Sequence, residues 1–418
     1  MKARKNIADG LDPDQNAAML RNAAQPLRIF IEPGGYRWGN LGDTMMLEVA
    51  LARLRSFWPD ASIKVHCLNP ERLRLLDARA EALDPSRIRA FPALAGRLPR
   101  SLRAMLPRAK AYLDAVRSAD LVLLSGAGSL NDSFKEHALE VLETIELAMK
   151  AGAVTALMGQ GIGPMKDATL RHRAATILPR VDLIALRESL AGLSLLQSMG
   201  VVPAEIKVTG DDAIALGYNA RPPTLGSSLG VNVRSAFYSE VGGDLLSAIG
   251  NVVREAGERR NTAIVPIPIS RYSGEDDLET VRRMMRDASF GEQADVGTTP
   301  ELLPLVSQCR VVVAGSYHAA VLALSMGIPA VAIARSDYYI DKFRGLAGQF
   351  GPACRVELTS HPDFLARLRS AIDGAWESAG ETREHLLRAA AQQIERSESA
   401  YRHVFDLVEE RRQLRKRT

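Results

Sequence analysis

From Leu27 onward, short apolar runs alternate with longer amphipathic stretches along most of the chain. Short apolar runs predict buried strands, and amphipathic stretches predict helices that cover the faces of a sheet. Their regular alternation is typical of a parallel sheet with helices packed on both faces. The pattern therefore predicts an α/β fold.

The first part of the pattern predicts one doubly wound domain. Its expected strands are residues 27–33, 62–68, 120–125, 154–158, 182–186 and 206–208. Its expected helices are residues 43–57, 133–150, 166–178 and 189–199. The chain of 418 residues has room for a second domain of similar size, because domains typically contain about 100–200 residues.

A domain boundary is predicted at residues 218–228, where turn formers accompany Pro222 and Pro223 and disfavour both helix and central strand. The alternation then restarts, with expected strands 229–234, 262–267, 310–314 and 330–334 and expected helices 240–259, 274–287 and 317–326. The predicted organisation is a flexible N-terminal arm (1–26), two Rossmann-like domains (27–217 and 229–376), and a C-terminal helix with a basic tail (377–418). The last helix, about residues 382–413, is in a position to pack back onto the first domain.

The cysteines and the apolar segments indicate the cellular location of the protein. Cys67, Cys309 and Cys354 are far apart and odd in number, so neither a disulfide framework nor a cysteine-based zinc site is expected. Residues 1–26 lack the apolar core of a secretory signal, and glycines and a proline interrupt the long uncharged stretch 311–334. We therefore expect a cytoplasmic protein without a membrane span.

The net charge of +4 comes from the C-terminal tail, since the rest of the chain carries a net charge of −1. The basic residues of this tail are Arg411, Arg412, Arg415, Lys416 and Arg417. No basic nucleic-acid groove is indicated, because the excess charge does not spread over the fold. The tail is interpreted as a solvated helix end, with peripheral contact to acidic lipids at the inner face of the membrane as the alternative.

Three glycine-rich loops follow predicted strands of the first domain. Their candidate binding residues are Gly42, Asp43, Gly126, Gly128, Ser129, Gln160 and Gly161. Glycine lets backbone N–H groups approach a ligand, and the carboxyl ends of parallel strands share one edge of the sheet. The loops therefore predict a surface for anions or sugar hydroxyls, although tight turns, with Asp43 as a helix N-cap, would need the same residues.

Charged residues stand at the ends of further strands in both domains. These residues are Arg187, Asp211, Asp212, Arg234 and Arg271. Arginine suits bidentate recognition of phosphate or carboxylate, and a carboxylate can act as a base or accept a sugar hydroxyl. They predict a site for a small polyanion in the cleft between the domains, and each is also compatible with a salt bridge, a helix cap or a surface charge.

The segment Ser316-Tyr317-His318 stands where an apolar strand stops and a helix begins. If Ser316 is the N-cap, His318 lies in the first helical turn, beside exposed amides and the positive end of the helix dipole. The dipole lowers the pKa of such a histidine and a bound phosphate raises it, so an anionic substrate would load the proton that a reaction needs. A buried structural histidine is the alternative.

Taken together, these motifs resemble the polysaccharide pyruvyl transferase family over about residues 27–351. The matching segments are Asn40-Leu41-Gly42-Asp43, Gly126 to Ser129, Gly159 to Pro164, Arg187-Glu188-Ser189, Gly210-Asp211-Asp212, Ser316-Tyr317-His318 and Gly327-Ile328-Pro329. The resemblance implies two Rossmann-like domains arranged like those of a GT-B glycosyltransferase. It also implies phosphoenolpyruvate as the donor substrate, with no cofactor and no metal ion.

The resemblance further implies an acceptor and a set of active-site residues. The acceptor would be a hydroxyl pair on a cell-envelope or exopolysaccharide sugar, carried by a lipid-linked oligosaccharide or a polysaccharide. The family's active-site histidine corresponds to His318 and its arginine to Arg187, while Lys342 is the nearest candidate for its lysine. Where many members have Arg-Asp, this chain has Arg187-Glu188.

The mechanism that we expect is formation of a pyruvate ketal. His318 would protonate C3 of phosphoenolpyruvate, while Arg187, Arg234 and Lys342 would hold its anionic groups. The main alternative is a nucleotide-sugar glycosyltransferase of the same architecture, because fold alone does not settle chemistry. A third possibility is a non-catalytic protein that binds anions or glycans.

Overall fold

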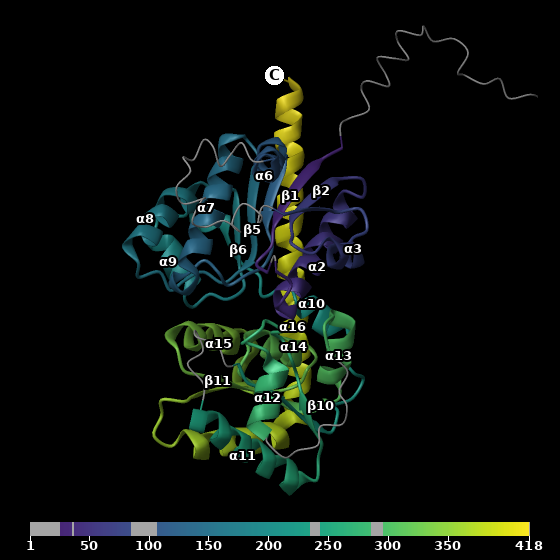
Figure 1. Cartoon of the computed structure of the whole chain (residues 1–418), viewed down its shortest axis with the longest axis vertical. Helices are drawn as coiled ribbons and strands as arrows, with labels where there is room; N and C mark the ends of the chain where they lie inside the picture. Colours follow the sequence, from purple (N-terminus) through teal and green to yellow (C-terminus); the bar gives the residue numbers. More distant parts are fainter. Residues whose placement is uncertain (1–25, 36, 85–106, 235–242, 286–295, 418) are drawn as a thin grey trace, which may run out of the picture.

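The computed structural model describes residues 26–35, 37–84, 107–234, 243–285 and 296–417. In these residues two parallel sheets lie one above the other, each covered by helices (Figure 1). The α/β fold predicted from the sequence is confirmed. The expected N-terminal arm lies outside the described residues, apart from Pro26.

Within the described residues, the sheet of the first domain has seven parallel strands in the order β3-β2-β1-β4-β5-β6-β7. The strands are β1 Arg28–Glu32, β2 Ser62–His66, β3 Glu81–Leu83, β4 Leu121–Leu124, β5 Val154–Gln160, β6 Leu183–Leu186 and β7 Ile206–Val208. The strand order reverses between β1 and β4, and ligands of open α/β sheets bind in the crevice beyond such a point. The loops after these two strands are therefore expected to border a ligand site.

The helices of the first domain follow the strands as expected, with some additions. They are α2 Leu41–Phe57, α3 Pro70–Leu76, α6 Pro107–Ser118, α7 Lys135–Lys150, α8 Ala168–Ile177, α9 Gly192–Ser198 and α10 Ile214–Asn219. The sequence pattern did not predict β3, α3 or α6, and the first two are too short to show a clear period. Helix α10 continues two residues into the expected linker and packs against α14 (Tyr317–Ser325) of the second domain.

In the described part of the second domain, five parallel strands form a sheet in the order β12-β11-β10-β8-β9. They are β8 Ser228–Asn232, β9 Ile264–Pro266, β10 Cys309–Ala314, β11 Ala330–Ala334 and β12 Cys354–Leu358. The other helices here are α11 Gly243–Arg260, α12 Asp277–Met285, α13 Thr299–Ser307 and α15 Asp337–Phe350. The uncharged stretch 311–334 folds as β10, α14 and β11, and no helix in the described residues is long and apolar enough to cross a membrane.

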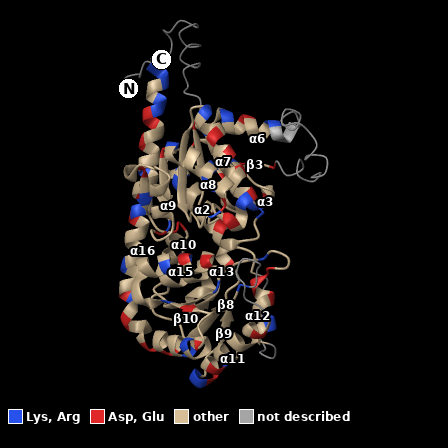
Figure 2. Cartoon of the chain, turned by 90° about the vertical axis from the view of Figure 1, so that its left-hand side faces the viewer, with Lys and Arg blue, Asp and Glu red and all other residues tan. Residues whose placement is uncertain are grey.

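The chain ends in α16, a helix of 54 residues from Phe364 to Arg417 that runs along both domains (Figures 1 and 2). It begins earlier than the predicted helix and is continuous across the predicted boundary at residue 377, because its first turns already pack into the core of the second domain. Further along, Tyr401 and Val404 are buried in the core of the first domain. Helix α16 therefore does pack back onto the first domain.

The basic end of α16 is partly held by acidic residues of the first domain. Arg411 forms an ion pair of 2.7 Å with Asp182, and Arg415 forms one of 3.2 Å with Asp120. Asp120 and Asp182 immediately precede β4 and β6, so this contact lies at the amino edge of the sheet, opposite the loops that carry the candidate site. Figure 2 shows the basic residues gathered at this end of the helix.

The two domains meet through a shared hydrophobic core. Met45 and Met46 of α2 are fully buried in one cluster with residues of α14 and β10. Backbone hydrogen bonds also join the domains, from Leu41 N to Ile269 O (2.9 Å) and from Arg271 N to Gly39 O (2.7 Å). These contacts fix the loop after β1 against the second domain.

Candidate active site

A cavity of about 590 Å³ lies between the domains and receives loops from both. Its lining includes predicted residues of the first domain (Asp43, Gly128, Ser129 and Arg187) and of the second (Arg234, Ser316, His318 and Lys342). Together with Arg37 and His137, these residues place three arginines, one lysine and two histidines around one space, and we call it the cationic cavity. Its volume lies within the range that is usual for small-molecule sites.

His318 is positioned by the start of α14. Ser316 has the extended backbone of an N-cap residue, and His318 lies in the first turn, 5% exposed. Its Nε2 atom lies 3.4 Å from Asp211 Oδ2. On its other side the ring packs against Gly42 of α2, where any Cβ would collide with it. Residues of the first domain therefore fix the orientation of this imidazole.

Arg187 follows β6 and is almost fully buried. Its guanidinium lies 3.6 Å from Asp211 Oδ2 and stacks on the ring of Tyr317, 4.2 Å from the ring centroid. Burial alone would raise the pKa of the Asp211 carboxyl, but the charges of His318 and Arg187 outweigh burial and hold it below its usual value. One buried carboxylate therefore lies against both side chains.

Arg234 follows β8 and is held by Asp277 at the start of α12. Its Nε and Nη2 atoms donate hydrogen bonds of 2.7 and 3.0 Å to the two carboxylate oxygens of Asp277. Its Nη2 atom also lies 3.4 Å from Ser316 Oγ. This bidentate pairing fixes the guanidinium plane, as such geometry typically does.

Lys342 reaches the cavity from α15. Its Nζ atom lies 3.4 Å from the centroid of the Tyr338 ring, one helical turn earlier, and close to Gly128 of the first domain. The Tyr338 hydroxyl donates a hydrogen bond of 2.9 Å to Gly128 O. Burial, together with the charge of Arg187, lowers the pKa of Lys342 well below its usual value. An anion entering the cavity would favour the charged form again.

Asp43 and Glu275 add carboxylates to this mostly cationic lining. Burial raises the pKa of Asp43, and the charges of His318, Arg187 and Lys342 oppose that rise without cancelling it. The alternative interpretation of Asp43 as a helix N-cap is wrong, because Asn40 holds that position and accepts a hydrogen bond of 2.9 Å from Gly42 N. Asp43 instead lies in the first turn and faces the cavity.

The sequence model of the family described as polysaccharide pyruvyl transferase matches residues 40–337, well over half of the chain. The chain belongs to this family. It is therefore a member of a transferase family, as its motifs suggested. No curated protein matches the chain significantly.

Comparison with solved structures shows the fold of this family member. A protein from Listeria monocytogenes, described as a UDP-N-acetylglucosamine 2-epimerase, is 14% identical to this chain. Its structure superimposes with a TM-score of 0.57 over 91% of this chain and 95% of that one. A glycosyltransferase from Rickettsia africae is 11% identical, with a TM-score of 0.54 over 92% and 99%. The UDP-GlcNAc 2-epimerase from Neisseria meningitidis, solved with UDP-GlcNAc bound, is also 11% identical, with a TM-score of 0.54 over 92% and 100%. The predicted GT-B-like arrangement is confirmed.

Three of the predicted glycines provide space for neighbouring side chains. A Cβ at Gly128 would lie 2.6 Å from Lys342 Nζ, and one at Gly161 would lie 2.8 Å from Arg187 Nε. Gly126, in turn, packs against Met46, outside the cationic cavity. These three glycines make room for the two cations and for a core methionine. That glycines of these loops bring backbone N–H groups close to a ligand stays a prediction.

Four other predicted residues lie outside the lining. Asp211 stands behind His318 and Arg187, as described above. The Gln160 amide donates to Ser125 O (2.9 Å), which makes it a link between neighbouring loops. Arg271 is held by Asp276 (2.7 Å) and Val296 O.

Asp212 points away from the cavity and anchors α16. Its carboxylate pairs with Arg53 (3.1 Å) and accepts hydrogen bonds from Ser397 Oγ (2.5 Å) and Tyr401 Oη (2.8 Å). Successive residues of one turn point in different directions, so of the adjacent carboxylates only Asp211 supports the cations of the cavity. The role predicted for Asp212 is replaced by a structural one.

Sequence reasoning missed several residues that shape the site. Tyr338 stacks on Lys342, and Asp277 holds Arg234. The spacing of four residues between Tyr338 and Lys342 is a helical signal that was available in the sequence. Asp277, by contrast, is 43 residues from its partner and offered no local signal.

Proposed function

We propose that this protein transfers the pyruvyl group of phosphoenolpyruvate to two hydroxyls of a saccharide, forming a ketal and releasing phosphate. The observation that carries the proposal is the convergence of Arg187, Arg234, Lys342 and His318 on one cavity between the domains. Phosphoenolpyruvate has a carboxylate and a phosphate attached to the same carbon, C2, so it needs several cations within a small volume. A bidentate arginine matches a carboxylate or phosphate better than a point charge does.

Each cation has a distinct part in this proposal. Arg187 and Arg234 are buried and held by carboxylates, so they are preorganised to bind the two anionic groups of the donor. Burial lowers the pKa of Lys342. A phosphate beside it would restore its proton and bring a further positive charge to the leaving group.

The chemistry then needs one acid and one base. His318 donates a proton to C3 of phosphoenolpyruvate, and positive charge develops at C2. The first sugar hydroxyl attacks C2 and passes its proton to Asp43, which balances the proton given by His318. The C2–O bond to phosphate then breaks, the second hydroxyl attacks C2, and its proton leaves with the phosphate.

The acceptor in this proposal is a sugar of a cell-envelope or exopolysaccharide precursor. A lipid-linked oligosaccharide would bring the protein to the inner face of the membrane. Lys416 and Arg417 are exposed at the end of α16 and are available there for acidic headgroups, while Arg411 and Arg415 pair with aspartates.

The test is an assay of phosphate release from phosphoenolpyruvate, with and without saccharides extracted from the cell envelope of the source organism. We expect release only with both substrates, together with a new ketal methyl signal in the ¹H NMR spectrum of the product. Release of nucleoside diphosphate from UDP-sugars would instead establish a glycosyltransferase. Binding of either donor without turnover would establish a non-catalytic protein.

A further inference from the structure

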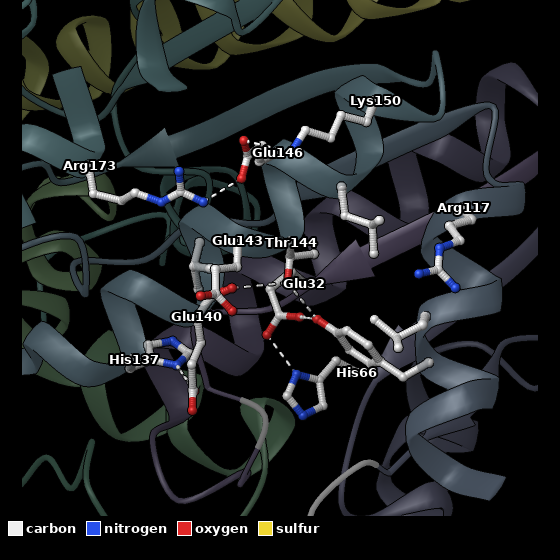
Figure 3. A pocket seen from close by; sticks show the side chains of 14 residues that line it. Glu32, His66, Arg117, His137, Glu140, Glu143, Thr144, Glu146, Lys150 and Arg173 are labelled. Atoms are coloured by element: carbon white, nitrogen blue, oxygen red, sulfur yellow. Dashed lines mark hydrogen bonds and ion pairs between the residues drawn. The ribbon is translucent and has the colours of Figure 1, made fainter. Parts of the chain in front are cut away.

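A second cavity, of about 610 Å³, opens on the first domain between α6 and α7 (Figure 3). It lies at the carboxyl ends of β1 and β2, which contribute Glu32 and His66. Tyr112 of α6 and Glu140, Glu143 and Thr144 of α7 also line it. We call it the Glu32 cavity, and no step proposed above uses it.

The centre of this cavity is a buried, charged carboxylate. Glu32 and His66 are each 4% exposed, and Glu32 Oε1 lies 2.6 Å from His66 Nδ1. The Tyr112 hydroxyl donates a hydrogen bond of 2.9 Å to Glu32 Oε2. Burial raises the pKa of Glu32, but the charge and hydrogen bond of His66 outweigh burial and leave the pKa below its usual value. Each oxygen thus has one fixed partner and keeps a lone pair for a further donor.

The surrounding side chains favour a ligand with many hydroxyls. Glu140 and Glu143 add two carboxylates to the wall, and Thr144 adds a hydroxyl that lies 2.9 Å from Tyr112 Oη. At the far end, Lys150 and Arg173 both pair with Glu146 (Figure 3). Arg117 also lines the cavity. The carboxylates of Glu32, Glu140 and Glu143 disfavour an anionic donor beside them, whereas sugar hydroxyls can donate hydrogen bonds to them.

The Glu32 cavity approaches the cationic cavity through a small recess. Glu32 lines the recess and the Glu32 cavity, Ser129 lines the recess and the cationic cavity, and His137 lines all three. Ser125 also lines the recess, and its fully buried hydroxyl has no hydrogen-bond partner among the described residues. The recess measures about 10 Å³, which is the size of one water molecule and far too small for a sugar ring.

We propose that the Glu32 cavity binds an uncharged saccharide unit of the acceptor, whose hydroxyls donate to Glu32, while a neighbouring unit of the same oligosaccharide reaches the cationic cavity. The site would hold the acceptor so that its reacting hydroxyls reach the donor. This placement of the acceptor rests on the proposed function. Binding of a saccharide to the Glu32 cavity does not.

Saturation-transfer NMR on the full chain tests the binding directly. The probes are the methyl glycosides of glucose, galactose, mannose and N-acetylglucosamine, each at millimolar concentration. We expect a signal from at least one probe with the wild-type chain. We expect Glu32→Gln to weaken binding of that probe by roughly tenfold, as loss of one charge-assisted hydrogen bond would do. Absence of any wild-type signal would overturn the proposal.

A second variant covers the case in which Glu32→Gln does not fold. Glu143 lies on the exposed wall, so Glu143→Trp fills the cavity without removing a buried group. Glu136 is exposed on the same helix and does not line the cavity, so Glu136→Trp is the matched control. We expect only Glu143→Trp to abolish the signal. Equal signals from the two variants, or displacement of the probe by phosphoenolpyruvate, would place the probe elsewhere and contradict the proposal.

The same variants separate this inference from the proposed function. Saccharide binding that depends on Glu32, without any turnover of phosphoenolpyruvate, would preserve the site and remove the proposed reaction. Turnover with an acceptor KM that Glu143→Trp does not change would preserve the reaction and remove the site. If the saccharide site and the proposed reaction are both correct, Glu143→Trp should raise the acceptor KM at least tenfold and leave the KM for phosphoenolpyruvate unchanged.

Discussion

Two cavities of nearly equal volume, about 590 and 610 Å³, lie close together at the carboxyl edge of the first sheet. Cations gather in one of them, between the domains, whereas the other contains a buried carboxylate and lies within the first domain. In each cavity, a central charged side chain is held in place by neighbouring side chains. Arg234 is held by Asp277, and Glu32 is held by His66 and Tyr112. The two cavities hardly differ in volume, so we expect the charged side chains in their linings to determine which ligand each one binds.

The strongest way to test this division is to remove the proposed acid from the cationic cavity. We expect His318→Ala to lower the rate of acceptor-dependent phosphate release by about 10²–10⁴-fold, because loss of a general acid typically has this effect. The folded state should persist, since the change removes a ring at the cavity edge and leaves α14 in place. Thermal unfolding checks the fold. Near wild-type turnover would exclude His318 as the acid.

Removal of one donor-binding cation should have the next largest effect. Arg187→Gln is expected to weaken use of phosphoenolpyruvate by about 1.5–3 kcal/mol, or roughly 10- to 100-fold in KM, because a charge-assisted contact is lost. Probe binding in the Glu32 cavity should not change. Arg396→Gln, at an exposed site on α16, is the matched control. An unchanged donor KM in Arg187→Gln would mean that the donor binds elsewhere.

Asp212 adjoins Asp211 in the sequence, but it stabilises the fold, whereas Asp211 contacts residues of the cationic cavity. Asp212→Asn weakens the contacts with Arg53, Ser397 and Tyr401 that attach α16 to the first domain. We expect a loss of about 1–3 kcal/mol in the free energy of unfolding, measured with urea, and no change in the donor KM. A large donor effect with unchanged stability would return Asp212 to the active site.

The smallest expected effect concerns Lys342 and the pH dependence of stability. The pKa of Lys342 is lowered in the folded chain, whereas an unfolded lysine titrates near 10.4. Between these two pKa values the unfolded chain binds more protons, so the wild-type chain gains stability as pH rises. Lys342→Met should therefore stabilise the ligand-free chain, most at pH values below the lowered pKa. The advantage should vanish as pH rises toward about 10.4, and urea unfolding at several pH values would reveal a pH-independent difference if Lys342 titrates normally.

Much of the fold could be predicted from the sequence because apolar runs and their spacing are local. Strand β7 and strand β11 were predicted to the residue, and His318 was found because a strand ends and a helix begins beside it. The long helix α16 was underestimated, since its first turns contain polar residues between the apolar ones that enter the core.

The candidate site was predictable only where each residue has a local context. Arg187 and Arg234 end strands and were identified, whereas Asp277 owes its role to a contact across 43 residues. Glu32 and His66 also end adjacent strands, and this signal was available but was not used. Which of two neighbours turns inward, as for Asp211 and Asp212, depends on packing against α16 that no local pattern shows.

Equilibrium binding of the donor is the most direct measurement. Isothermal titration of the wild-type chain and of Arg187→Gln with phosphoenolpyruvate, and of the wild-type chain with UDP-GlcNAc, needs no knowledge of the acceptor. We expect saturable binding of phosphoenolpyruvate that Arg187→Gln weakens at least tenfold, and no saturable binding of UDP-GlcNAc. Saturable binding of UDP-GlcNAc with no heat from phosphoenolpyruvate would contradict the assignment of the cationic cavity as a phosphoenolpyruvate site.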